Sequence, residues 1–205
     1  MVADQSNHFF DTRDRALDRA RIGVRLRETG ARLRLTVKSD PVHAADPGAP
    51  RDAMVTRRVE LEATISRDAF ERALADGLDL TPWVASWRAG PSARDPDVAR
   101  VLDTLGGVGR LETFGAFRNE RTTGQLDLGS ADREVRVEVE LDRTRFPGDR
   151  LDHELEIELD ARTDEAEARA IREAVLDRLA EMGIRATAAP SKLERFRDAL
   201  DRGDR

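Results

Sequence analysis

The chain has 205 residues, a formal net charge of −6 and no cysteine. The negative net charge argues against broad nucleic-acid binding, which needs a basic face to displace counterions. The lack of cysteine excludes disulfides, thiolate metal sites and cysteine nucleophiles. No apolar run approaches the ~18 residues of a membrane span, and nothing near Met1 resembles a signal peptide. We therefore predict a cytoplasmic protein that binds neither nucleic acid nor membrane.

The length fits one domain over residues 1–205. Charged residues make up 37% of the chain and aromatic residues only 4%, so the charges must gather on particular faces of the fold. Of the 35 basic residues only two are lysine, Lys38 and Lys192. The sequence leaves the oligomeric state open.

The first predicted element is a hairpin in "VRLRETGARLRLTVK", residues 24–38, where apolar and polar residues alternate on both sides of a Thr-Gly pair. Because side chains alternate across a strand, one face of this hairpin is apolar and the other is strongly cationic. The cationic face carries Arg25, Arg27, Arg32, Arg34 and Lys38.

A loop rich in proline, glycine and alanine is predicted over residues 39–52, and the alternation of "RRVELEATI" then predicts a strand. The polar side of this strand carries Arg58, Glu60 and Glu62. A helix over residues 66–76 is predicted to be capped by its serine, a turn of helix contains Trp83 and Trp87 packed on the core, and another short helix covers residues 98–105.

Four further strands are predicted over residues 110–118, 119–128, 133–142 and 151–160. In "REVRVEVELD" the valines and Leu141 share one side, opposite Glu138, Glu140 and Asp142. In "HELEIELD" the apolar residues lie opposite Glu154, Glu156 and Glu158. Two helices complete the chain, one over residues 164–182 and one starting at residue 191, and each begins with the sequence of a capping box.

The charged strand faces allow two interpretations. One is a half-solvated sheet with cross-strand ion pairs worth roughly 0.2 to 1 kcal/mol each. The other is a barrel with a charged, solvent-filled interior, because such a lining is too costly to keep dry. Converging arginine and lysine favour a polyanion, and carboxylates tolerate that anion when Mg²⁺ lies between them. This interpretation predicts a site for the metal complex of an oligophosphate.

Eight segments stand in order between residues 5 and 196: "QSNHFFDTRDRAL", "VRLR", "RLTVK", "RRVELE", "GAFRNER", "VELDRTRF", "HELEIE" and "PSKLERF". In these segments and their order the sequence resembles the CYTH or triphosphate tunnel metalloenzyme family, in its triphosphatase-like branch.

This resemblance implies an α+β fold, an antiparallel eight-stranded tunnel-type β-barrel with flanking helices, and a triphosphate-containing small molecule as substrate with Mg²⁺ or Mn²⁺. The substrate-binding residues that it implies are Arg25, Arg27, Lys38, Arg58, Arg121 and Lys192. The implied catalytic residues are Glu154, Glu156 and Asp142. The implied metal ligands are Glu154 and Glu156, with Glu60 and Glu62 as further acidic residues of the site.

The sequence departs from the family pattern at its start. The family's first strand, with the pattern E-x-E-x-K, stands before the "QSNHFFDT" segment, and here only "MVAD" comes before Gln5. A late start codon, a truncated chain and a real loss of the strand are the three explanations. We favour an artefact of the start, since a lost strand would expose unpaired groups at a sheet edge.

The leading functional hypothesis is metal-dependent hydrolysis of a short triphosphate, either inorganic tripolyphosphate or a small organic triphosphate. An alternative is class IV adenylyl cyclase chemistry on ATP. A further alternative is a non-catalytic module that binds triphosphate or polyphosphate, because the first strand is missing. The simplest alternative is a half-solvated sheet that binds a protein partner.

Overall fold

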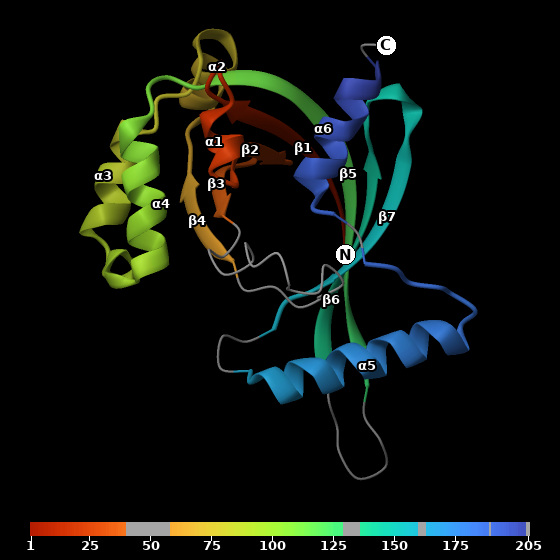
Figure 1. Cartoon of the computed structure of the whole chain (residues 1–205). Helices are drawn as coiled ribbons and strands as arrows, with labels where there is room; N and C mark the ends of the chain where they lie inside the picture. Colours follow the sequence, from red (N-terminus) through yellow and green to blue (C-terminus); the bar gives the residue numbers. More distant parts are fainter. Residues whose placement is uncertain (40–57, 129–135, 160–162, 189, 204–205) are drawn as a thin grey trace. The chain divides into compact units, whose positions relative to one another are not determined.

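The computed structural model describes residues 1–39, 58–128, 136–159, 163–188 and 190–203. Within these ranges the chain is α+β, as predicted, with antiparallel strands and α-helices (Figure 1). The strands are β1 (Val2–Asp11), β2 (Ile22–Thr29), β3 (Arg32–Ser39), β4 (Val59–Thr64), β5 (Glu112–Asp127), β6 (Arg136–Arg145) and β7 (Leu151–Ile157). The α-helices are α1 (Ala16–Arg19), α2 (Arg67–Asp76), α3 (Thr81–Ala89), α4 (Pro96–Gly107), α5 (Glu165–Glu181) and α6 (Lys192–Gly203).

The strands follow the order β4-β3-β2-β1-β5-β6-β7, so the described part of the sheet is open, with β4 and β7 at its ends. The described residues separate into two compact units. The N-terminal unit comprises residues 5–39 and 58–118, and the C-terminal unit comprises residues 1–4 and the described residues from 119 onward. A single domain over residues 1–205 stays a prediction.

The predicted hairpin of residues 24–38 is confirmed as β2 and β3, which pair in register from Ile22 with Ser39 to Thr29 with Arg32. Gly30 adopts φ 57° in the turn, a left-handed conformation that costs glycine little. The predicted apolar face is also confirmed, because Val24, Leu26, Leu35 and Val37 are buried.

Strand β1 is one of the elements that the sequence pattern did not reveal, with the short helix α1. Its residues "VADQSNHFFD" contain a polar run in place of a clear alternation, and the polar Asn7 is fully buried. β1 pairs with β2 from Ser6 opposite Glu28 to Phe10 opposite Val24. Pairing with an already regular neighbour therefore makes this segment a strand, which local propensity alone did not indicate.

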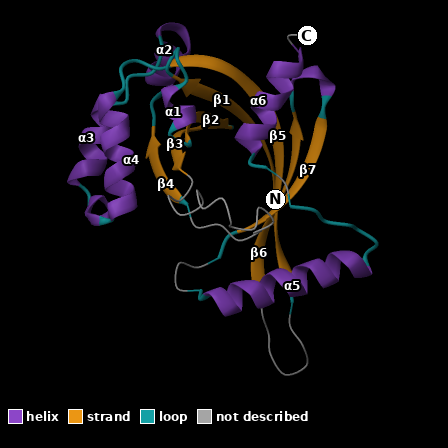
Figure 2. Cartoon of the chain, viewed as in Figure 1, coloured by secondary structure: helices purple, strands orange, loops and turns teal. Residues whose placement is uncertain are grey.

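The N-terminal unit has its hydrophobic core between one face of β2–β4 and the helices α2, α3 and α4. Ser66 caps α2 as predicted, since its Oγ accepts a hydrogen bond from the amide of Ala69 at 3.3 Å. Both Trp83 and Trp87 pack partly buried against this core, as predicted. Helices α3 and α4 lie side by side (Figure 2).

The prediction of two separate strands over residues 110–118 and 119–128 is wrong, because β5 (Glu112–Asp127) is one continuous strand. Phe117 and Asn119 are both buried and share one face of it. The chemistry of that face changes from apolar to polar between these residues while the backbone period of two continues. The change of chemistry looked like the end of a strand in the sequence.

Strands β6 and β7 form a hairpin in which Asp142 lies opposite Glu154 and Glu140 lies opposite Glu156. The predicted strand end is wrong, because β6 extends to Arg145 rather than to residue 142. Burial changes face along β6: the apolar Val137 is buried near its start, whereas farther along Asp142 is 0% exposed and Leu141 is 47% exposed. Val135, predicted on the apolar side, lies outside the described residues.

Both predicted helix starts near the end of the chain are confirmed. Asp164 accepts a hydrogen bond from the amide of Glu167 at 2.8 Å and begins α5. At α6 the capping box is reciprocal: the amide of Glu194 donates to Ser191 Oγ at 3.3 Å and the amide of Ser191 donates to a Glu194 carboxylate oxygen at 2.8 Å. Across the described part of the chain, every helix is too short or too polar to cross a bilayer.

Candidate functional site

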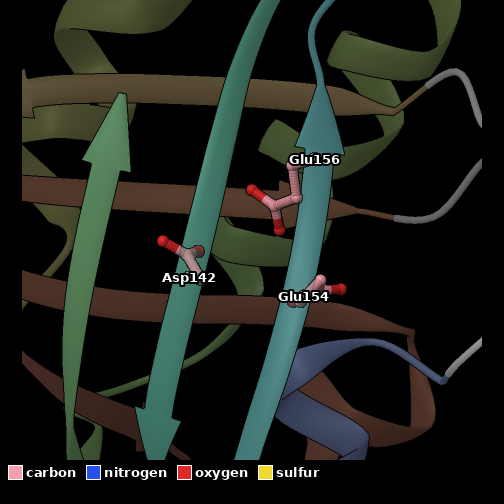
Figure 3. A group of neighbouring side chains, drawn as sticks. All are labelled: Asp142, Glu154 and Glu156. Carbon is pink, nitrogen blue, oxygen red and sulfur yellow. The ribbon is translucent and has the colours of Figure 1, made fainter. Parts of the chain in front are cut away.

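A group of three carboxylates lies on the hairpin of β6 and β7. Asp142 comes from β6, and Glu154 and Glu156 come from β7 (Figure 3). One ligand oxygen from each of the three residues lies within 4.8 Å of the others. The pairing explains this convergence, because Asp142 is directly opposite Glu154 and residues two apart on a strand share a face. We call these three residues the carboxylate triad.

Lys192, the first residue of α6, contacts all three members of the triad. Its ammonium nitrogen lies 2.6 Å from Asp142, 2.6 Å from Glu154 and 2.5 Å from Glu156, and its side chain is 12% exposed. The first residue of α6 therefore places a single cation among three carboxylates. This explains the lysine that follows the capping serine, since a cation is otherwise unfavourable in a first helical turn.

Arg121 on β5 supplies the second cation. Its Nε and Nη2 donate to the two carboxylate oxygens of Asp142 at 2.8 and 2.6 Å, and Nη2 also donates to Glu156 at 3.0 Å. It forms a further ion pair with Glu140. A two-pronged contact of this kind fixes both orientation and charge.

The mutual contacts decide the charge state of the site. Burial by itself would raise the pKa of Asp142, but hydrogen bonds and charge from Arg121 and Lys192 outweigh burial and hold this pKa well below its ordinary value. The balance is the same at Glu156, where burial is outweighed mainly by Lys192 and the pKa is lowered. At Glu140 burial dominates and raises the pKa.

At the two cations, Lys192 and Arg121, burial and the neighbouring carboxylates act on the pKa in the opposite directions. Burial alone would lower the pKa of Lys192, whereas the charges of Glu156, Glu154 and Asp142 raise it on balance. Burial would likewise lower the pKa of Arg121, and its bond to Asp142 more than reverses this effect. The site thus holds ionised groups of both signs in partly buried positions.

The triad fits a hard divalent cation. Carboxylate oxygens are the ligands that Mg²⁺ and Mn²⁺ prefer, and the pKa values of Asp142 and Glu156 are lowered, so both offer ionised oxygens. Glu154 completes the set. Lys192 occupies the space between the same oxygens, so the ammonium and a metal ion compete for them.

The remaining predicted residues lie in the N-terminal unit. Lys38 pairs with Glu60 at 3.0 Å, and Arg34 pairs with Glu62 at 2.5 Å. The Nε of Arg27 donates to the buried Asn7 at 3.0 Å. Arg25 lies half-buried on β2, between Phe9 of β1 and Thr36 of β3.

Arg58 is exposed just before β4. Among the described residues, the group of possible metal ligands contains neither Glu60 nor Glu62. The roles of these two glutamates as metal ligands stay predictions, as do the substrate-binding roles of the cations in this unit.

Sequence reasoning did not single out Arg195, Glu140 or Asn119 as parts of the site. A signal for Arg195 was present, because it follows Lys192 by three residues and such residues share one face of a helix. Asn119 accepts a hydrogen bond from Thr144 at 2.7 Å and helps to lower the pKa of Asp142. Its signal was its position two residues before Arg121 in the same strand.

Comparison with protein families identifies the chain. The model of the CYTH domain matches residues 2–195, and the chain therefore belongs to the CYTH family. No curated protein matches it significantly. The residues of the carboxylate triad, together with Arg121 and Lys192, all lie within the matched region.

Solved structures show the same fold. A protein from Hippeastrum, described as a proposed adenylyl cyclase with a dominant triphosphatase activity, is 24% identical with a TM-score of 0.66 over 97% of this chain and 83% of its own. A proposed adenylate cyclase from Bacillus halodurans is 20% identical with a TM-score of 0.59 over 95% of this chain and 82% of its own. A protein from Pyrococcus horikoshii is 16% identical with a TM-score of 0.50 over 100% of this chain and 86% of its own.

Proposed function

We propose that this protein is a divalent-metal-dependent triphosphatase that hydrolyses a short triphosphate such as inorganic tripolyphosphate. The observation that carries the proposal is the carboxylate triad with Lys192 and Arg121 in direct contact with it. Such a site combines ligands for a hard cation with donors for phosphate oxygens. The fold neighbour from Hippeastrum is described as having a dominant triphosphatase activity, which favours hydrolysis over cyclisation.

The triad of Asp142, Glu154 and Glu156 would hold Mg²⁺ or Mn²⁺. When bound, the divalent ion neutralises charge on the phosphoryl group that is transferred. Lys192 would release the carboxylates that it contacts in the free protein, and its ammonium would donate to a phosphate oxygen instead. Arg121 keeps Asp142 in place through two hydrogen bonds and supplies positive charge where negative charge develops.

The reaction would use water as the nucleophile. The water oxygen forms a bond to the terminal phosphorus, and the anhydride P–O bond to that phosphorus breaks. Tripolyphosphate then yields orthophosphate and pyrophosphate. The proton that the attacking water loses passes to solvent, so no other co-reactant is required.

The cations of the N-terminal unit are proposed as further substrate-binding residues, on the basis of the family's motifs. These are Arg25, Arg27, Lys38 and Arg58. Glu60 and Glu62 are proposed as acidic residues that hold a metal ion or position these cations. Substitution of each residue by a neutral residue of similar size, with the triphosphate affinity measured each time, tests these roles one by one.

The central test measures phosphate release from tripolyphosphate, ATP and thiamine triphosphate with Mg²⁺ or Mn²⁺. We expect release by the unmodified chain, none after chelation with EDTA and none by Glu156→Gln or Glu154→Gln. Glu120→Gln is the matched control, because Glu120 loses the same charge on the exposed side of β5 and should keep full activity.

The same incubation separates the alternatives. Cyclic AMP formed from ATP would favour the cyclase and contradict hydrolysis as the main activity. Tight binding of triphosphate without turnover would favour a binding module, and the lack of binding to all three compounds would overturn the proposed function altogether.

A further inference from the structure

Arg195 is a buried arginine next to the carboxylate triad, and the proposed reaction does not use it directly. It lies on α6 three residues after Lys192, and its side chain is 6% exposed. Its Nη2 donates to Glu154 Oε2 at 2.7 Å, and its Nη1 donates to Asp152 at 3.2 Å. The guanidinium therefore joins two carboxylates that are two residues apart on β7.

The surroundings of Arg195 hold its side chain in one orientation. The guanidinium carbon lies 5.8 Å from the centroid of the Phe146 ring. Phe146 in turn stacks with Phe196 at 6.4 Å between ring centroids, and Phe196 is fully buried. A planar guanidinium on an aromatic face keeps a defined direction for its donors, which a lysine ammonium does not.

Glu154 contacts Arg195 and is also a member of the carboxylate triad. The same carboxylate oxygen, Oε2, receives both the Nη2 of Arg195 at 2.7 Å and the ammonium of Lys192 at 2.6 Å. If Lys192 leaves to bind phosphate, the bond from Arg195 continues to orient this carboxylate. A glutamate side chain that is already ordered loses less conformational entropy when it binds a ligand.

We infer that Arg195 is a positioning residue that holds the Glu154 carboxylate in the orientation in which it joins Asp142 and Glu156 as a metal ligand. The inference rests on the proposed metal-binding role of the triad. Two effects of Arg195 oppose each other, because its positive charge repels a divalent cation whereas its hydrogen bond orders a ligand. Loss of such outer partners typically lowers metal affinity about 10- to 100-fold, so ordering should outweigh repulsion.

Arg150 provides a matched control. It donates to the same Asp152 carboxylate at 3.2 and 3.0 Å, and its guanidinium carbon also lies 5.8 Å from the centroid of Phe146. Its side-chain hydrogen bonds go to Asp152 rather than to Glu154. Arg150 therefore shares the ring and one partner of Arg195 but lacks the contact on which the inference depends.

The experiment measures Mn²⁺ binding by the whole chain without substrate, from the electron paramagnetic resonance signal of free Mn²⁺. We expect Arg195→Gln to bind Mn²⁺ about tenfold or more weakly than Arg150→Gln, with Arg195→Lys in between. Affinity of Arg195→Gln equal to that of Arg150→Gln, or tighter, would overturn the positioning role, and tighter binding would mean that charge repulsion dominates.

Circular dichroism checks that each variant is folded. If Arg195→Gln does not fold, Arg195→Lys is compared with Arg150→Lys, and equal Mn²⁺ affinity of these two overturns the inference. Failure of the proposed function is distinguishable, because the unmodified chain would then bind no Mn²⁺ at all. Mn²⁺ binding by the unmodified chain with no difference between the arginine variants contradicts the positioning role alone.

Discussion

The two lysines of the chain lie in two regions with the same residue types and different burial. On β3 and β4, Lys38 pairs with Glu60 at 3.0 Å, and the two side chains are 41% and 39% exposed. At the start of α6, Lys192 meets three carboxylates, and its side chain is 12% exposed. One region is a pair of solvated charges, and the other is a partly buried network.

This difference in burial changes what each ion pair contributes. An exposed pair contributes about 0 to 1 kcal/mol and weakens with salt. In a buried network the removal of one partner leaves uncompensated charge, which is strongly destabilising. Charges held in place away from water also act more strongly on a bound anion. The C-terminal unit is therefore where we expect both the chemistry and the largest mutational effects.

The largest expected effect is on stability at Asp142. Asp142→Ala removes the buried partner of both Arg121 and Lys192, and we expect a loss of about 3 kcal/mol in the free energy of unfolding. Glu60→Ala, which breaks the exposed pair with Lys38, should cost less than about 1 kcal/mol. Urea unfolding of both variants measures the two values. Equal losses would remove the distinction between the regions.

The next effect concerns metal affinity at Lys192. Lys192→Met removes the ammonium that competes for the triad, so Mn²⁺ binding without substrate should tighten about tenfold, or ~1.4 kcal/mol. Affinity for triphosphate should fall in the same variant, because a phosphate-binding cation is lost. Titration calorimetry with each ligand measures both changes. Weaker Mn²⁺ binding would show that Lys192 supports the triad rather than competing with a metal ion.

A smaller effect is expected at Lys38. Lys38→Met should change the free energy of unfolding by less than about 1 kcal/mol, because the pair with Glu60 is exposed. We expect weaker triphosphate binding with unchanged Mn²⁺ binding, measured in the same titrations. Unchanged triphosphate affinity would make Lys38 an ordinary surface lysine.

The smallest effect concerns His8, which is half-buried on β1 in the N-terminal unit. Burial lowers the pKa of His8, and the charge of Glu28 opposes this only in part. Folding therefore favours the neutral ring, so the folded state gains a little stability as pH rises through the ordinary histidine pKa of about 6.5. An NMR titration of the ring should give a pKa below that value. A pKa above it would show that Glu28 outweighs burial.

Much of the fold was predictable from local patterns. The β2–β3 hairpin, the cap of α2 at Ser66 and the capping box at Ser191 each depend on residues close together in the chain. Local sequence determines such features because strand alternation and helix capping involve neighbouring residues. The ordered motifs likewise indicated the CYTH family, which the match over residues 2–195 confirms.

The tertiary structure alone decided which faces are buried. Alternation in "VRVEVELD" separates two faces of β6 but does not say which one faces the interior, and Asp142 is buried because Arg121 and Lys192 reach it from distant parts of the chain. The continuity of β5 and the contact between Arg195 and Glu154 were likewise decided by the tertiary structure. The residues and their spacing are properties of the sequence, whereas the burial of a charge depends on partners that only the folded chain brings together.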